Sequence, residues 1–312
     1  MRRRWTRRDW LRAATLAPWL PASMARSWAQ TDRTRLILLG TSGGPRPKID
    51  RAATSQVILV GDDAYVVDCG DGVSQRLVAA GVDLQRLRKV FITHHHSDHN
   101  ADYGNLLLLS WAAGLRSPVD TYGPPPLARM TELYFELNAY DIETRMDDEE
   151  RVPLVPLVTA HEISAGGVVA EDDHVRVTAA LADHPPVTPA LAYRFDTADR
   201  SIVMSGDTAY SENVLELARD ADVLVHEALF VPGLERTVAK APNAPRLLEH
   251  IIASHTTAED AGRLAAAARV KMLVLSHLVP ADDPAVGPDV FRTEAAKHYS
   301  GEIIVAADLM EI

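Results

Sequence analysis

The sequence predicts an α/β fold in which two β-sheets lie between two outer layers of helices. Short runs rich in β-branched residues occur in two groups along the chain, and each group is followed by segments with helical periodicity. Many of the predicted strands end in an aspartate or a glutamate, or have an aspartate or a histidine within the next two residues. These observations fit a four-layer αββα sandwich whose strand-end loops meet along one edge, and a functional site is expected at that edge.

The predicted strands are short alternating or continuous apolar runs. In chain order they cover residues 35–39, 56–60, 64–68, 89–92, 175–182, 190–196, 201–205, 223–227, 271–276 and 302–305. In the predicted helices, apolar residues recur three or four positions apart. These helices cover residues 73–80, 105–115, 126–137, 212–219, 246–253, 258–268 and 290–298.

Length and composition predict one large domain. With 312 residues, 47% of them hydrophobic, the chain can bury a sizeable core, and nothing in it is repeated or of low complexity. Residues 30–312 are therefore expected to form the functional domain. Cys69 is the only cysteine, so no internal disulfide can form, and a core of this size does not need one.

The first 30 residues differ from the rest and predict an export signal over residues 1–29. They hold seven arginines and one acid, then a short, weakly apolar stretch at 13–20, then small residues before Gln30. Arg7 and Arg8 lie in a stretch that resembles a twin-arginine signal, with cleavage expected after Ala29. This predicts a periplasmic or secreted protein.

An uncleaved amphipathic membrane anchor is the alternative interpretation of this segment. Pro18 and Pro21 would break such a helix. The apolar stretch is too short for a helix that spans a membrane, so no stable membrane insertion is expected once the signal is cleaved.

The charge balance argues against nucleic acid as a partner. The chain carries a formal net charge of −11, and removal of seven arginines and one aspartate with the first 30 residues would leave −17. Nucleic-acid binding depends on Lys and Arg that replace phosphate counterions, and the sequence that would remain after cleavage shows no local basic cluster. A small molecule is therefore the expected partner, and a homodimer is left open.

Residues 93–99, Thr-His-His-His-Ser-Asp-His, follow the apolar run 90–92 and place four metal-ligand side chains at one strand-to-loop junction. On an extended backbone His94 and His96 project to the same side, and Asp98 and His99 follow where the chain turns. Imidazoles bind borderline metals and a carboxylate adds a hard oxygen, so the motif suits two ions. The alternatives are a solvated loop or a capping Asp-His pair before a helix.

The motif H-x-H-x-D-H at 94–99 resembles that of the metallo-β-lactamase-fold hydrolases, within the branch of ribonuclease Z, zinc-dependent arylsulfatases and cyclic-nucleotide phosphodiesterases. The resemblance runs from about Arg35 to the C-terminus. Seven further segments carry the same resemblance: LGTSGG at 39–44, VDCGDG at 67–72, YGP at 122–124, SGDT at 205–208, HEALF at 226–230, HTT at 255–257 and LSHL at 275–278. The resemblance implies the four-layer αββα metallo-β-lactamase sandwich.

The resemblance also implies a ligand set for two divalent ions, with zinc expected and manganese or iron as alternatives. His94, His96 and His184 would hold one ion. Asp98, His99 and His277 would hold the other, and Asp207 would bridge the two. Other roles stay open, because His184 precedes a proline pair and could be a turn residue, and Asp207 could be a helix N-cap.

Two adjacent cations can activate a bridging water and stabilise a tetrahedral centre, which predicts a hydrolase. Asp98 can orient the attacking water as well as bind metal. His255 matches the histidine that contacts the scissile phosphate in the ribonuclease Z branch, and Glu227 matches the carboxylate that orients it. The alternative is that His255 only caps or packs and Glu227 is a surface strand end.

The remaining histidines have no comparable context and are interpreted as structural or exposed: His161, His174, His226, His250 and His298.

Ribonuclease Z carries a long arm that grips tRNA, and here residues 184–207 are too few to form one. Together with the export signal and the acidic charge, this predicts an exported hydrolase of a small sulfate ester or phosphodiester, and it disfavours tRNA processing. A lactonase or other carbonyl-ester hydrolase is one alternative. From another class, a non-catalytic metal-binding or redox protein is the second.

Overall fold

The computed structural model describes residues 33–312 of the chain. The predicted export signal, with Arg7, Arg8 and the cleavage site after Ala29, lies outside the described residues. Within 33–312, no helix has the length and apolar character needed to cross a membrane.

The first sheet has seven strands in the order β14-β1-β2-β3-β4-β5-β6. β1 to β3 pair in antiparallel fashion, whereas β3 to β6 are parallel, so the chain crosses over between these strands through helices. The strands are β1 (Arg35–Gly40), β2 (Ser55–Val60), β3 (Asp63–Val67), β4 (Leu87–Phe91), β5 (Val119–Gly123), β6 (Val158–Glu162) and β14 (Met310–Glu311).

The second sheet also has seven strands, in the order β13-β12-β11-β10-β9-β8-β7. β10 to β13 are parallel and β7 to β10 are antiparallel. The strands are β7 (Gly167–Glu171), β8 (Arg176–Ala182), β9 (Ala190–Asp196), β10 (Ser201–Met204), β11 (Val223–Leu229), β12 (Met272–Val279) and β13 (Glu302–Val305).

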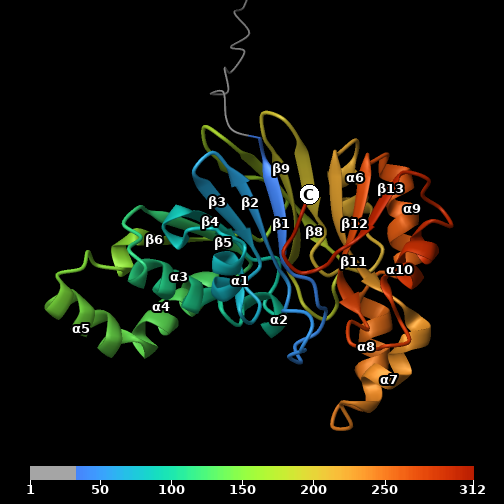
Figure 1. The fold of residues 1–312 in the computed structure, drawn as a ribbon, viewed down its shortest axis with the longest axis horizontal. Helices are drawn as coiled ribbons and strands as arrows, with labels where there is room; N and C mark the ends of the chain where they lie inside the picture. Colours follow the sequence, from blue (N-terminus) through green and yellow to red (C-terminus); the bar gives the residue numbers. More distant parts are fainter. Residues whose placement is uncertain (1–32) are drawn as a thin grey trace, which may run out of the picture.

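Helices cover the outer face of each sheet, and this arrangement confirms the predicted four-layer αββα sandwich (Figure 1). The first sheet is covered by α1 (Val73–Ala79), α3 (Tyr103–Ala112) and α4 (Leu127–Leu137), with α2 (Ser97–Asn100) at its edge and α5 (Ala139–Glu149) beyond α4. The second is covered by α6 (Glu212–Ala218), α9 (Ala258–Ala268) and α10 (Pro288–Ala295).

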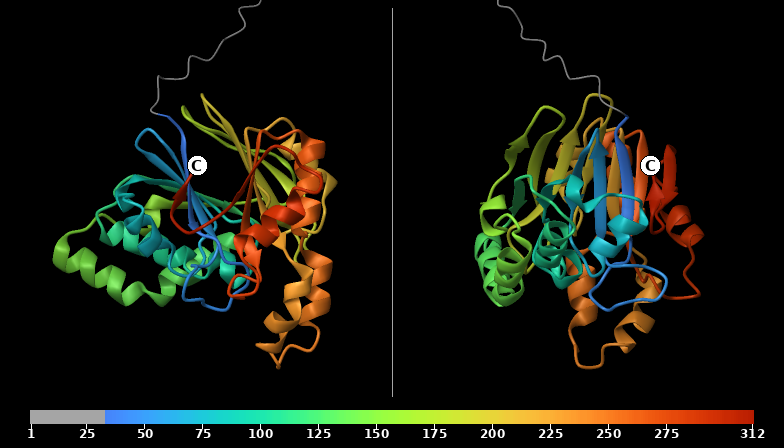
Figure 2. Two further views of the ribbon diagram at one scale, coloured as in Figure 1. Left: turned by 45° about the vertical axis from the view of Figure 1, so that its right-hand side comes forward. Right: turned by 60° about the vertical axis from the view of Figure 1, so that its left-hand side comes forward.

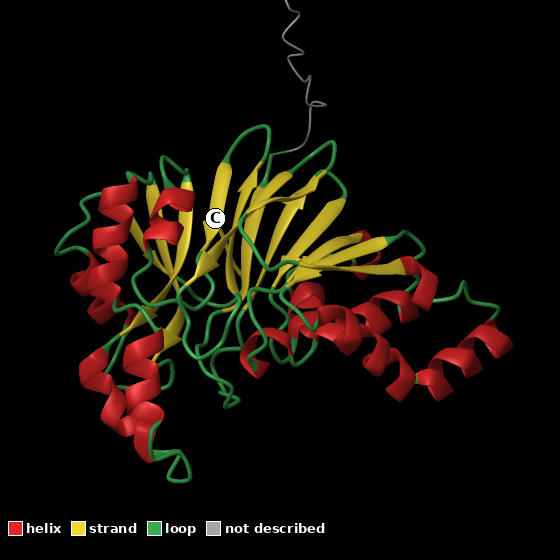
Figure 3. Ribbon diagram, turned by 180° about the vertical axis from the view of Figure 1, so that it is seen from behind, coloured by secondary structure: helices red, strands yellow, loops and turns green. Residues whose placement is uncertain are grey.

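Two short helices, α7 (Leu234–Ala239) and α8 (Leu247–Ser254), form a hairpin that projects beyond the end of the second sheet (Figure 3). Single turns of 3-10 helix lie at Leu84–Arg86, Val155–Leu157 and Val231–Gly233.

The two sheets pack face to face over an aromatic core (Figure 2). Phe91 on β4 meets Phe195 on β9 edge to face, with ring centroids 5.1 Å apart. Tyr193 and Tyr122 pack against the same ring. Strands buried on both faces, such as β2 and β12, carry the continuous apolar runs that the sequence analysis recognised.

Four strands were not predicted: β5, β6, β7 and β14. β6 and β7 are the edge strands of their sheets and are largely exposed, so they lack both the apolar run and the regular alternation that indicate a strand. β14 is only two residues long.

Candidate metal centre

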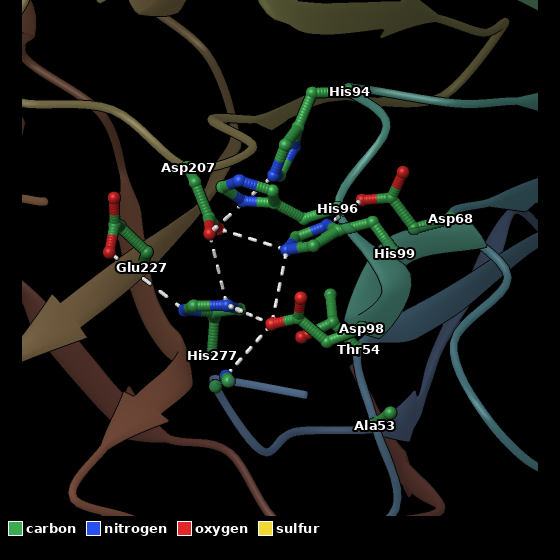
Figure 4. A network of polar contacts seen from close by, with 12 residues as sticks. Ala53, Thr54, Asp68, His94, His96, Asp98, His99, Asp207, Glu227 and His277 are labelled. Carbon is green, nitrogen blue, oxygen red and sulfur yellow. Dashed lines mark hydrogen bonds and ion pairs between the residues drawn. The ribbon is translucent and has the colours of Figure 1, made fainter. Parts of the chain in front are cut away.

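The candidate site lies where loops from both sheets meet at one edge of the sandwich (Figure 4). His94, His96, Asp98 and His99 follow β4, with His96 immediately before α2. His184 follows β8 and Asp207 follows β10. His277 is placed by a bulge: Glu227 on β11 pairs with Ser276 and Ala228 pairs with Leu278, so His277 is the extra residue on β12.

His277 has a positive φ of 46°, a left-handed conformation that is uncommon for a residue with a β-carbon. The bulge turns its imidazole out of the ladder and toward Asp98 and Asp207, whose Oδ2 atoms lie 3.3 and 3.2 Å from His277 Nε2. Backbone strain is thus concentrated at a residue that the site uses.

The first group of candidate ligands comprises His94, His96, His184 and Asp207, whose ligand atoms all lie within 4.8 Å of one another. His184 Nε2 is 3.2 Å from His96 Nδ1, and His94 Nε2 is 3.9 Å from Asp207 Oδ2. Burial lowers the pKa of His184 to about 4, so its imidazole is neutral at pH 7 and has a lone pair to offer.

The second group comprises Asp98, His99, Asp207 and His277, again within 4.8 Å. His99 Nε2 lies 3.2 Å from Asp207 Oδ1. Asp207 belongs to both groups and lies between them in Figure 4. Burial opposes its charge, but His277 and His99 hold the pKa of Asp207 well below its usual range, so the carboxylate is ionised.

The donor atoms themselves fit metal ions. His94 Nε2, His99 Nε2 and Asp207 Oδ1 are buried, and none makes a well-aligned hydrogen bond among residues 33–312, although His99 Nε2 and Asp207 Oδ1 lie 3.2 Å from each other. Buried polar atoms are rarely left unpaired, because the loss of their hydration is costly. Atoms that converge without hydrogen bonds are explained if cations lie between them, and imidazoles with carboxylates are a donor set that suits zinc.

Hydrogen bonds fix the orientation of these ligands. His99 Nδ1 is 2.8 Å from Asp68 Oδ2, and Asp68 also accepts from the backbone N–H of Thr93 at 2.8 Å. His184 Nδ1 donates to the carbonyl of Ser254 at 2.8 Å, which leaves the lone pair of the neutral ring on Nε2. Such partners hold the tautomer and the ring plane of a metal-binding histidine.

The side chain of His95, between the candidate ligands His94 and His96, points away from both ligand groups. Its Nε2 donates to the carbonyl of Pro124 at 2.7 Å, which holds the ring outside both ligand groups.

His255 and Glu227 form a buried pair beside the centre, with His255 Nδ1 2.7 Å from Glu227 Oε2. The other carboxylate oxygen of Glu227 accepts from the backbone N–H of Thr208 at 2.6 Å. Burial opposes the charge of His255, but the Glu227 carboxylate outweighs it and raises the pKa of His255 to about 9. The imidazole is therefore a charged donor at pH 7. With Asp207 and His277 these two residues also form a third group of potential ligand atoms.

A cleft of about 380 Å³ opens onto the centre. One wall is the β1–β2 loop, where Gly44 N donates to Asp98 Oδ2 at 2.8 Å and Lys48 lies close by. The opposite wall is the α7–α8 hairpin.

Three cations gather at this cleft around one carboxylate. Arg46 and Lys240 each contact Asp282 at 2.9 Å, and Lys48 lies near all three charges. Burial lowers the pKa of Lys48 to about 8. No run of basic residues in the sequence reveals this cluster, because Arg46 and Lys48 are about 190 positions from Lys240.

His250, which its sequence context predicted to be structural or exposed, lies in the cleft. It lies on α8 and lines the cleft, with its ring centroid 5.9 Å from that of His96 and 6.0 Å from that of His184.

Comparisons with known proteins agree on the family. The model of the Beta-lactamase superfamily domain matches residues 64–278. Ribonuclease Z of Mycobacterium bovis is 35% identical over 283 residues, which cover 89% of this chain and 97% of the relative. Ribonuclease Z of Mycobacterium tuberculosis is 33% identical, with the same coverage of both chains.

Solved structures share the fold. The metallo-β-lactamase-fold protein YhfI of Bacillus subtilis superimposes with a TM-score of 0.66 at 23% identity, covering 90% of this chain and 99% of YhfI. The short form of human tRNase Z superimposes with a TM-score of 0.64 at 22% identity, covering 89% of this chain and 98% of the human chain.

These relatives overturn three predictions. The prediction of an exported hydrolase of a small ester, with tRNA processing disfavoured, is wrong, because the curated relatives are ribonucleases. The prediction that nucleic acid is not a partner is wrong for the same reason, and the net charge misled because it averages over a local group of cations. A periplasmic or secreted location is likewise contradicted by relatives that carry the name of an RNA-processing enzyme.

Proposed function

Because this chain belongs to the β-lactamase superfamily, in its ribonuclease Z branch, and is accordingly a metal-dependent hydrolase, we propose that it cleaves a phosphodiester bond of RNA, with a precursor tRNA as the substrate. The observation that carries this proposal is the pairing of His255 with Glu227 beside the candidate metal centre, in a chain 35% identical to ribonuclease Z over 89% of its length. The pair places a charged proton donor where the leaving oxygen of a phosphodiester would lie.

We propose that His94, His96 and His184 hold one divalent ion, that Asp98, His99 and His277 hold a second, and that Asp207 serves both. Zinc is the proposed metal, because imidazole nitrogen predominates among the donors. When bound, such a pair of ions supplies Lewis acidity and activates a water for attack.

The side chains of the chain itself would then divide the remaining work. Asp98, held by the N–H of Gly44, would orient the attacking water. His255 would give its Nε2 proton to the departing oxygen, while Glu227 keeps the imidazole charged and fixes its direction. Thr208 N in turn fixes Glu227.

Recognition of RNA would depend on the walls of the cleft. Between His184 and Asp207 the chain forms only β9, β10 and short loops, so no arm extends from this point of the fold. Arg46, Lys48 and Lys240 bring local positive charge to a chain of net charge −11. Cations of this kind bind phosphates and release counterions, so binding should weaken as salt rises.

The experiment is cleavage of a precursor tRNA by the purified chain with added zinc, compared with Asp207→Ala and with a chelated sample. We expect a single cut that needs both the metal and Asp207, with a KM that rises with salt. Hydrolysis of bis(p-nitrophenyl) phosphate serves as a probe of the metal centre alone. If the small diester is hydrolysed and no RNA is cleaved at any salt concentration, the proposed RNA substrate is wrong.

A further inference from the structure

His250 extends from α8 into the group of histidines at the centre. Its ring centroid lies 5.9 Å from His96, 6.0 Å from His184 and 6.1 Å from His255. Its Nδ1 is 3.4 Å from the hydroxyl of Ser254. No hydrogen bond to its Nε2 occurs within residues 33–312, and the side chain is half-buried in the lining of the cleft. The ring thus carries a free polar atom at the place where substrate must enter.

The helical repeat places the side chains of α8, the helix that carries His250, on two opposite faces. Leu247, His250 and Ile251 line the cleft, one turn apart along the inner face. Leu248 and Ile252 lie on the outer face, with 39% and 51% of their surfaces exposed. Residue 252 therefore offers a matched position on the same helix that cannot reach the cleft.

The C-terminal end of α8 is held in place by hydrogen bonds to the loop that carries the candidate ligand His184. Ser254, at the end of the helix, accepts a hydrogen bond from His184 Nδ1 through its carbonyl and donates from its hydroxyl to the carbonyl of Pro185. Leu247 and Ile251 pack beneath the hairpin against Leu229 and Val279. The position of His250 relative to His96 and His184 is thus fixed by packing rather than by a free loop.

The two sides of the cleft differ in chemistry. The side chains of α7 and α8 that line the cleft are uncharged and mostly aliphatic around His250. Lys240, directly after α7, is paired with Asp282 and does not line the cleft. The cations Arg46 and Lys48 lie on the opposite loop. Phosphate groups are attracted to the cations, and an uncharged, partly apolar group suits the α8 wall. In RNA that group is the ribose with its base.

We propose that α8 forms a nucleoside subsite, in which Leu247 and Ile251 pack against the ribose or base of the nucleotide that keeps the scissile phosphate and His250 Nε2 hydrogen-bonds to it. This inference rests on the proposed function, because it names the part of the RNA that one wall of the same site receives. His250 is a binding residue in this scheme and takes no part in proton transfer.

The test compares two diesters with the same leaving group, uridine 5′-(p-nitrophenyl phosphate) and methyl p-nitrophenyl phosphate. The wild-type chain should bind the nucleoside ester more tightly. In His250→Ala, the KM for the nucleoside ester should rise roughly 3- to 10-fold, the usual worth of one hydrogen bond, with kcat changed less than about 2-fold. The methyl ester should be unaffected. His250→Gln should recover part of the lost affinity, and Ile252→Ala should behave as wild type for both esters.

Metal content and thermal unfolding of each variant separate the outcomes. Equal losses on both esters, or a loss of bound zinc in His250→Ala, would make His250 a support of the metal centre and overturn the subsite. An unchanged KM for both esters, or equal wild-type affinity for the two, would also overturn it. Wild-type protein that hydrolyses neither diester nor precursor tRNA would instead refute the proposed function.

Discussion

Two helical pairs project from the sandwich, α4–α5 on the side of the first sheet and α7–α8 at the end of the second (Figures 1 and 2). Each pair lines a cavity. The groove formed with α4, α5 and β6 has about 650 Å³ and is lined largely by apolar side chains such as Phe135, Ile142 and Met146. The cleft beside α7–α8 is smaller, at about 380 Å³.

The difference between these cavities is in the polar groups that they bring together. Glu132, Glu136 and Glu143 line the α4–α5 groove, and no histidine or lysine joins them. None of the potential metal groups among residues 33–312 lies there. The α7–α8 cleft is lined by four histidines and three aspartates: His96, His250, His255, His277, Asp98, Asp207 and Asp282. Convergent polar groups, and not volume, therefore distinguish a reactive site from an apolar hollow.

The largest effect should come from changing Asp207, the residue that is shared by both proposed metal positions. We expect Asp207→Ala to lose most of its bound metal and more than roughly 10³-fold of its activity, since the loss of metal removes several kcal/mol of transition-state stabilisation. Elemental analysis and rates on bis(p-nitrophenyl) phosphate measure this. Glu132→Ala in the α4–α5 groove is the matched carboxylate control. Full metal content in Asp207→Ala would rule out the bridging assignment.

Next in size should be the loss of the proposed proton donor. His255→Ala should keep its metals and slow hydrolysis by roughly 10²- to 10⁴-fold. The loss should be greatest for an alkyl leaving group and smallest for p-nitrophenolate, which departs without a proton. Equal losses across leaving groups would indicate that His255 binds charge or positions the substrate instead.

A smaller effect is expected from the carboxylate behind that histidine. Glu227→Gln keeps an oxygen for Thr208 N but removes the charge that raises the pKa of His255 to about 9. Activity that needs protonated His255 falls as pH rises through this pKa. The variant should lower the pKa of His255, so the alkaline limb of its pH–rate profile should move to lower pH. We expect a loss of roughly 10- to 100-fold at neutral pH, as for other orienting carboxylates. An alkaline limb at the wild-type position would show that Glu227 does not set the charge of His255.

Those parts of the site that follow predicted strands could be located from the sequence. Asp207 and His277 end apolar runs, and the parallel strands that carry them must open at the same edge, so their proximity follows from topology. His250 could not be found in this way, since its role depends on how closely α8 approaches the loop of His184.

The charge of the cleft was hidden for a related reason. Arg46 and Lys240 become neighbours only when the β1–β2 loop and the α7–α8 hairpin meet at Asp282. Net charge reports the whole surface, whereas an RNA strand responds to the potential within about 10 Å, the screening length at moderate salt. The α4–α5 groove has the opposite local charge, and that contrast can be tested.

The smallest effect is expected from changing the charge of that groove. Glu136→Lys places a cation on an exposed position of α4, where the existing ion pair with Arg129 is exposed and contributes little. Stability should change by less than about 0.5 kcal/mol, and the KM for precursor tRNA by less than about 2-fold, because the groove does not face the centre. Arg46→Glu in the cleft is the matched reversal, and it should raise the same KM by roughly tenfold in low salt, with the difference disappearing as salt rises. If Glu136→Lys tightened RNA binding as much as Arg46→Glu weakened it, RNA would have to pass over both helical pairs, and the distinction between the two cavities would fail.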